Sequence, residues 1–100
     1  MEIIVNKIII DGELICSERD FHAQIAGQLG VDVFYGRNLD ALWDLLSSSI
    51  ERPVELSWIS SQKSALALGP RFDDIVEILR RVVEQDAQYD WEDRFSFVLL

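Results

Sequence analysis

The sequence contains few of the residues on which catalytic and metal chemistry usually depends. Its 100 residues include one cysteine, Cys16, and one histidine, His22. An internal disulfide and a cysteine cluster for a metal are therefore excluded, and we expect Cys16 to pack as a small buried hydrophobic residue. His22 lies one position off the apolar stripe of its segment, so we expect it at the surface or in a local hydrogen bond. The short motifs of phosphate loops, serine hydrolases and zinc proteases are also absent, and we expect no catalytic residue, metal or cofactor.

Long hydrophobic runs are missing as well. No uninterrupted apolar stretch approaches the roughly 18 residues that a membrane-spanning helix needs. The first residues, Met1-Glu2, lead into a β-branched stretch without a basic region or a small-residue cleavage site, so we expect no signal peptide. Together with the lone cysteine, these absences predict a cytoplasmic protein that does not bind membranes.

Basic residues are half as numerous as acidic ones. The chain has 18 Asp and Glu residues against 9 Lys and Arg, which gives a net charge of −9 at pH 7. We therefore expect no binding to nucleic acid, because Lys and Arg hold its phosphates. The charge is compatible with a basic protein partner, because summed charge steers encounters. It is equally compatible with solubility alone.

The apolar pattern predicts a single α/β domain over residues 1–100. The length suffices for one modest core, and 49% apolar residues are typical of a globular chain. The expected strands are 2–10, 54–58 and 94–100, and the expected helices run from about 17 to 30, from 38 to about 49, over 60–68 and over 71–85. Because two helices separate each strand from the next, we expect a two-layer fold with a three-stranded parallel sheet and about four helices.

Three places in this pattern carry further expectations. The β-branched residues at 3–5 and 8–10 predict a first strand buried on both faces for much of its length. Asp11-Gly12 then predicts a tight turn, followed either by a short hairpin or by a turn away toward the next helix. Trp58, in the second strand, is expected to pack in the core or at the strand end.

The stretch 34–46 organises the chain, because it predicts an ordered loop that leads directly into a helix. Gly36 marks the turn, since glycine adopts a positive φ without cost. Asn38 is a good N-cap, because its side-chain oxygen can accept from the first helical turn. The residues that follow place one apolar stripe on the helix, made of Leu39, Leu42, Trp43 and Leu46.

Asp40 and Asp44 lie four residues apart on one edge of that stripe. Asp40 is stabilised by the helix dipole, Asp44 gains little from it, and the two repel each other by a few tenths of a kcal/mol. The pair is either a solvated face or an acidic recognition face for a cationic partner. An acid–base pair would need a cleft that raises one pKa, and a metal would need a further ligand. The spacing provides neither.

The run from Tyr35 to Asp44, Tyr-Gly-Arg-Asn-Leu-Asp-Ala-Leu-Trp-Asp, resembles the signature of the barstar family, which are small intracellular inhibitors of secreted ribonucleases. The likeness is weaker on both sides, where residues 53–58 match the family's second strand. It implies a barstar-like two-layer fold, with a turn toward a helix after Asp11-Gly12. It also implies a non-enzymatic protein whose acidic helix edge and preceding loop enter a ribonuclease active site, where substrate phosphates would otherwise bind.

The resemblance also implies which residues bind the partner. Asp44 would be the main anchor and Asp40 the second, while the other residues shape the loop and the start of the helix. The expected partner-binding residues are Phe34, Tyr35, Gly36, Asn38, Leu39, Asp40, Trp43, Asp44 and Arg81. The expected partner is a basic ribonuclease, and the chain is expected to be a monomer when free. The alternative is a barstar-fold interaction module that binds a different protein.

Four features depart from the family's pattern. Phe34 replaces a tyrosine and lacks its hydroxyl, and Ser48-Ser49 replaces Gly-Trp. Arg81 falls where the family has a partner-contacting glutamate, so its charge would repel a cationic active site. The acidic segment 86–93 is longer than the family's turn. We expect this segment to be mobile, with one of its two aromatic residues, Tyr89 or Trp91, packed back on the core.

Overall fold

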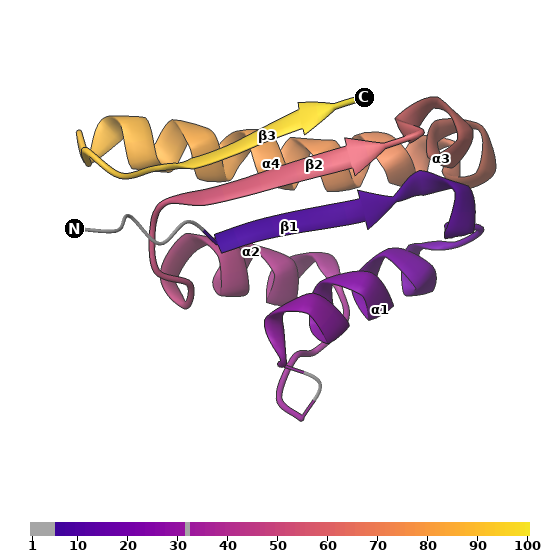
Figure 1. Ribbon diagram of the computed structural model, residues 1–100, viewed down its shortest axis with the longest axis horizontal. Helices are drawn as coiled ribbons and strands as arrows, with labels where there is room; N and C mark the ends of the chain where they lie inside the picture. Colours follow the sequence, from indigo (N-terminus) through magenta and orange to yellow (C-terminus); the bar gives the residue numbers. More distant parts are fainter. Residues whose placement is uncertain (1–5, 32) are drawn as a thin grey trace.

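The computed structural model of the protein describes residues 6–31 and 33–100. In this part of the chain, two α-helices separate each strand from the next, as shown in Figure 1. They are β1 (Asn6–Asp11), the 3₁₀ helix η1 (Gly12–Leu14), α1 (Glu18–Leu29), α2 (Leu39–Ser48), β2 (Val54–Ile59), α3 (Ser61–Leu68), α4 (Pro70–Gln88) and β3 (Phe95–Leu99). This order confirms the predicted α/β class. Residues 2–5 of the predicted first strand lie outside the described residues.

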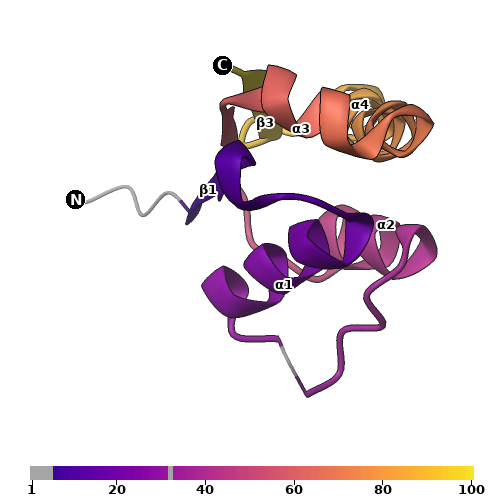
Figure 2. The same ribbon diagram turned by 90° about the vertical axis from the view of Figure 1, so that its right-hand side faces the viewer.

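The strands form one sheet in the order β1-β2-β3. Both pairs are parallel, and Ile8 lies beside Leu56, which lies beside Phe97. Figure 2 shows α2 and α4 on the same side of this sheet, with α1 below β1. The predicted parallel sheet and its layer of helices are therefore confirmed.

Within the described residues only one face of the sheet is covered, so the expectation that the first strand is buried on both faces is wrong for residues 6–11. Ile8 and Ile10 are fully buried, whereas Ile9 between them is 54% exposed. Ser57 and Val98, which are in register with Ile9, are half-buried and exposed respectively. A β-branched run predicts an extended backbone, but the same residues suit a strand with one face open.

Trp58 lies at the centre of the core, as predicted. Its ring stacks on Phe21 with centroids 4.9 Å apart and meets the edge of Phe72 at 5.0 Å. Its indole Nε1 donates to the hydroxyl of Ser64 at 2.9 Å. The one polar atom of this large buried side chain is therefore satisfied.

Gly12 fixes the direction of the chain after β1. A Cβ on this residue would lie 2.4 Å from the carbonyl oxygens of Ile59 and Ser60, so no other residue fits between η1 and the end of β2. The carbonyl oxygen of Gly12 accepts from the hydroxyl of Ser64 at 3.0 Å. The chain therefore turns away toward α1, and the alternative hairpin does not form.

The outer edge of β1 is covered by two glutamines of α1. Gln28 exchanges hydrogen bonds with the backbone of Ile9, whose N–H donates to its Oε1 at 2.7 Å. Gln24 exchanges bonds with Asp11 in the same way, at 2.8 and 3.0 Å. Because these amide side chains take the place of a further strand, this edge is protected from pairing with another chain.

Cys16 is exposed, so its expected burial is wrong. It lies at the entrance to α1, where its backbone N–H donates to Oδ2 of Asp20 at 2.9 Å. The same carboxylate accepts from the N–H of Ser17 at 3.2 Å, as expected of a capping box. The segment is thus fixed through its backbone, and the thiol is left at the surface.

Helix α4 continues to Gln88, beyond its predicted end. Asp86 is fully buried and accepts two hydrogen bonds from Arg52, at 2.9 and 3.0 Å, and one from the N–H of Phe95 at 2.7 Å. Burial alone would raise the pKa of Asp86, but the bonds from Arg52 and Phe95 outweigh it and hold the pKa below its ordinary value. Asp86 therefore ties α4 to β3, and its assignment to a loop at 86–93 is wrong.

The two aromatic residues after α4 stack on each other, with ring centroids 5.2 Å apart. Tyr89 is 62% exposed and Trp91 is 41% exposed, so the expectation that one of them joins the core is wrong. Trp91 instead lies over the guanidinium of Arg52, 5.6 Å from the ring centroid. It shields the buried ion pair from one side. The mobility of this segment stays a prediction.

Candidate protein-binding site

The site is built on α2. Asn38 caps the helix as predicted, because its Oδ1 accepts from the N–H of Ala41 at 2.7 Å. Leu42, Leu45 and Leu46 hold the helix in the core, and none of them is more than 4% exposed. The opposite edge of the helix is therefore fixed in position at the surface.

Asp40 and Asp44 form an acidic ridge along this outer edge. Both residues are exposed, and their spacing places them one turn apart as predicted. Within residues 6–31 and 33–100, neither carboxylate forms a hydrogen bond or an ion pair. The hydroxyl of Ser48, one turn further on, donates to the carbonyl oxygen of Asp44 at 2.8 Å. The ridge thus presents two carboxylates that the fold itself does not use.

The loop before α2 turns at Arg37, and the expectation of a positive φ at Gly36 is wrong. Arg37 has a φ of 58°. A Cβ on Gly36 would lie only 3.1 Å from the Cβ of Ala41. Packing therefore favours glycine here, because a side chain at this position would crowd the first turn of α2 where the loop passes close to it.

Tyr35 anchors the loop from inside. It is 7% exposed, and its hydroxyl lies 2.5 Å from Nδ1 of His22, whose Nε2 lies 2.8 Å from Oε2 of Glu18. Burial raises the pKa of Tyr35, and the charge of Glu18 raises it further, so its hydroxyl stays protonated. His22 is buried, which contradicts a surface position, while its expected local hydrogen bond is confirmed.

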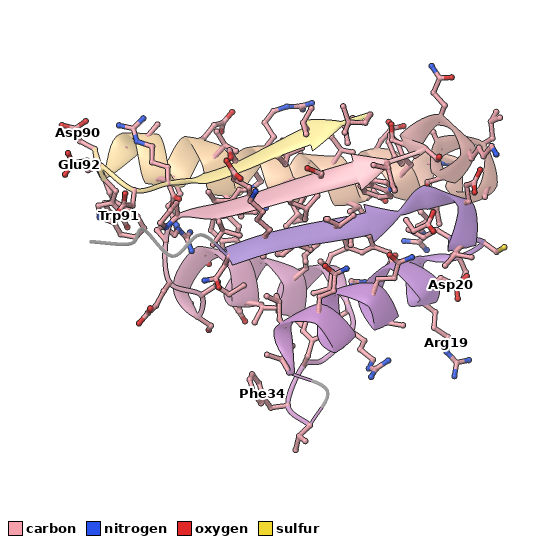
Figure 3. The ribbon with its side chains drawn as sticks, viewed as in Figure 1. Arg19, Asp20, Phe34, Asp90, Trp91 and Glu92 are labelled. Atoms are coloured by element: carbon pink, nitrogen blue, oxygen red, sulfur yellow. The ribbon has the colours of Figure 1, made fainter. Side chains whose placement is uncertain are left out.

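Phe34 points the opposite way from Tyr35. It is 73% exposed, and Figure 3 shows its ring near the tip of the loop, away from the sheet. A hollow of about 150 Å³ lies between this loop and α2. It is lined by Phe34, Tyr35, Gly36, Ala41, Asp44, Leu45 and Ser49. One flank of the acidic ridge therefore combines an exposed aromatic ring with a small hollow.

The other flank carries a cation. Arg81 of α4 is exposed, and its guanidinium lies over the ring of Trp43 at 4.7 Å from the centroid. Trp43 is half-buried and packs against the core, as does Leu39 at the start of the helix. The structure thus places Arg81, which is distant in sequence, over Trp43, the residue that precedes Asp44 of the acidic ridge.

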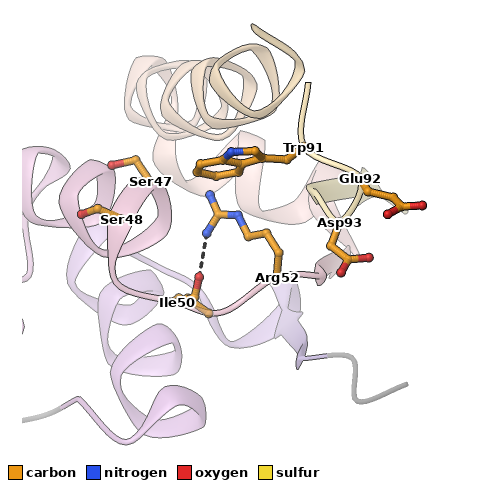
Figure 4. A pocket seen from close by; sticks show the side chains of 7 residues that line it. All are labelled: Ser47, Ser48, Ile50, Arg52, Trp91, Glu92 and Asp93. Carbon is orange, nitrogen blue, oxygen red and sulfur yellow. Dashed lines mark hydrogen bonds between the residues drawn. The ribbon is translucent and has the colours of Figure 1, made fainter. Parts of the chain in front are cut away.

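A hollow of about 440 Å³ lies beyond the end of α2, and the sequence analysis did not identify it. Its lining consists of Ser47, Ser48, Ile50, Arg52, Trp91, Glu92 and Asp93. Figure 4 shows the guanidinium of Arg52 between the Ile50 carbonyl oxygen, which accepts its Nη1–H at 2.9 Å, and the indole of Trp91. Local spacing could not have revealed this site, because its walls come from segments far apart in the sequence.

The arrangement is suited to binding. Exposed carboxylates on a fixed helix can form charge-assisted hydrogen bonds with cationic groups of a partner. The hollows beside them leave room for side chains of that partner. Among the described residues, no group of three or more His, Cys, Asp and Glu could hold a metal ion. No described helix is long and apolar enough to cross a membrane. Fold and surface together define a small α/β protein with an acidic helical ridge suited to a protein partner.

Comparison with known proteins names this class more closely. The family model described as "Barstar (barnase inhibitor)" matches residues 5–99, and the chain belongs to the barstar family. The chain is also 34% identical over 95 residues to a protein of Bacillus subtilis (strain 168) named "Putative ribonuclease inhibitor YrdF", across 95% of this chain and 99% of that protein. The resemblance carried by residues 35–44 is therefore confirmed. At the level of the family, the function is inhibition of a ribonuclease, which is a protein partner.

Proposed function

We propose that this chain inhibits a ribonuclease by placing its acidic ridge, with the loop tip at Phe34, against the enzyme's cationic active site. The observation that carries the proposal is the exposure of Asp40 and Asp44, without a hydrogen bond or ion pair among the described residues. Carboxylates in this position can bind the Arg, Lys and His side chains with which a ribonuclease holds phosphates. Membership of the barstar family supports the same conclusion.

The way the site is held also favours tight binding. Buried leucines fix α2, and the buried Tyr35 fixes the loop, so little conformational entropy is lost when a partner binds. The net charge of −9 accelerates encounter with a basic enzyme. We also propose that the chain is a monomer when free and acts in the cytoplasm, where the exposed thiol of Cys16 would stay reduced.

Barnase is the first enzyme to test, because the family description names it. Asp44→Asn should weaken binding by about 2–5 kcal/mol, since a cation on the enzyme is then left buried and unpaired. The unfolding free energy of this variant should barely change, because Asp44 is exposed and its replacement removes only a like charge next to Asp40. The matched control Glu55→Gln removes one charge from the open face of the sheet and should leave affinity nearly unchanged. The proposal fails if Asp44→Asn lowers stability and leaves affinity intact.

A second candidate is a barstar-fold module that binds a protein other than a ribonuclease. One observation favours it: the cation Arg81 stands beside the acidic ridge, where a fully cationic active site would be repelled. The genes on either side discriminate between the two. A small, basic, secreted ribonuclease encoded next to this chain favours inhibition, whereas a neighbour without nuclease activity that co-purifies through Asp44 favours the module.

A further inference from the structure

Among the described residues, Arg81 contacts an aromatic ring and no carboxylate. Its guanidinium lies over Trp43, the residue that precedes Asp44 in the acidic ridge. In the part of the chain that the structure describes, this ring contact is the interaction that Arg81 makes. Arg80, one residue earlier on the same helix, donates instead to Glu77 at 2.7 Å. The positive charge of Arg81 is therefore available to bind a negatively charged group of another molecule.

The position of Arg81 is fixed by its surroundings. Trp43 packs against the core, and Gln85, one turn after Arg81, donates to the carbonyl oxygen of Ser47 at 3.1 Å, which joins α4 to α2. The contact with Trp43 is a cation–π interaction and uses none of the N–H groups of Arg81 as a hydrogen-bond donor, so among the described residues these donors remain available. A hollow of about 300 Å³ beside it leaves room for a partner side chain. Its lining is Trp43, Arg81, Glu84, Gln85, Gln88 and Tyr89.

We propose that Arg81 is a specificity-determining residue that binds a carboxylate of the partner protein. The partner then presents cations to the acidic ridge and, directly beside them, an Asp or Glu to Arg81. A planar guanidinium can bind a carboxylate through two parallel hydrogen bonds, and such a pair would strengthen binding of a partner with this charge pattern. An enzyme whose active-site rim is cationic throughout is rejected, because like charges meet at Arg81. The inference rests on the proposed function and adds the kind of ribonuclease that the chain selects.

Charge reversal at Arg81 and at its neighbour Arg80 tests whether Arg81 repels a cationic active site. Dissociation constants for barnase are measured with the wild type, Arg81→Glu, Arg81→Gln and the control Arg80→Glu. Arg81→Glu should bind barnase about tenfold or more tightly than the wild type, with Arg81→Gln between them. Arg80→Glu makes the same charge reversal away from Trp43 and should change the constant less than about threefold at 0.15 M salt. Melting temperatures check that each variant is folded.

A second measurement tests the attraction. Barnase variants that each carry one Lys→Glu or Arg→Glu substitution on the active-site rim are titrated against the wild-type chain and Arg81→Glu. The wild type should bind at least one of them more tightly than it binds barnase. Arg81→Glu should lose that preference, because its own carboxylate then faces the introduced one.

The outcomes separate this inference from the proposed function. Equal affinity of Arg81→Glu and Arg80→Glu for barnase, or no rim variant preferred by the wild type, overturns the inference. If Asp44→Asn in the Arg81→Glu background still abolishes binding, the proposed function survives that result. If Arg81→Glu binds barnase and Asp44→Asn has no effect, the proposed function fails as well. Absence of binding by every variant also overturns the inference, because Arg81→Glu is expected to bind barnase.

Discussion

Replacing Asp86 by alanine should remove a large part of the stability of the protein. Its fully buried carboxylate accepts two hydrogen bonds from Arg52 and one from the N–H of Phe95. Without it, a guanidinium that is only 8% exposed loses its counter-ion, and a backbone N–H loses its acceptor. Removing one member of a buried pair costs about 3–5 kcal/mol and an unsatisfied N–H about 1–3 kcal/mol. Because the two effects overlap, we expect a loss of about 4–6 kcal/mol, against a usual total of about 5–15 kcal/mol.

Urea unfolding followed by circular dichroism measures this loss. The matched control is Glu77→Ala, because Glu77 pairs with Arg80 at 2.7 Å but is 55% exposed and lies within a helix, where alanine is well tolerated. An exposed ion pair contributes about 0–1 kcal/mol, so this variant should unfold nearly as the wild type does. If Asp86→Ala loses no more stability than Glu77→Ala, the buried pair does not hold α4 against β3, and the reasoning is refuted.

The same pair predicts how stability depends on pH. Hydrogen bonds hold the pKa of Asp86 below its ordinary value of 3.8, so the folded protein binds this proton less readily than the unfolded chain does. The stabilisation is therefore fully present above the unfolded-state pKa and is lost as the pH falls through the lower folded-state pKa. Asp86→Asn should reduce the dependence of the unfolding free energy on pH in this acid range. Parallel pH profiles for the variant and the wild type would contradict this assignment.

Two further predictions concern the loop and the edge of the sheet. Tyr35→Phe should lower the unfolding free energy by about 1–3 kcal/mol, because Nδ1 of buried His22 loses its hydrogen-bond partner. Phe34→Ala, at an exposed position, should change it by less than about 0.5 kcal/mol in the same urea titration. The double variant Gln24→Ala, Gln28→Ala should self-associate as its concentration rises, because the edge of β1 is uncovered. Sedimentation velocity measures this, and a variant that associates no more than the wild type would argue against the role of the glutamines.

Features set by near neighbours could be predicted from the sequence. Asn38 caps α2 through a residue three positions away, and the apolar period of α2 follows from its own residues. Asp40 and Asp44 share one edge because of helical geometry alone. The local spacing at 34–46 thus gave the position of the acidic ridge and of its preceding loop.

Features set by distant partners could not be predicted in this way. Asp86 looks like one more acid in a polar segment, and its burial depends on Arg52, 34 positions earlier. Gln28 looks like a surface residue, yet it bonds to the backbone of Ile9, 19 positions away. The contact of Arg81 with the ring of Trp43 likewise requires α2 and α4 to pack against each other. A polar residue carries no periodic signal for such contacts.

The acidic residues of this protein differ in whether the fold uses them. Asp86 holds Arg52 and the start of β3, Asp20 accepts from the backbone at the start of α1, and Glu18 contacts the ring of His22. Asp40 and Asp44 have no such role among the described residues, although their mutual repulsion weakens α2 slightly. Folding therefore does not account for these two carboxylates, because no described residue pairs with them and they repel each other. A partner that supplies cations does account for them, which is why the proposed function rests on these two carboxylates and not on the net charge.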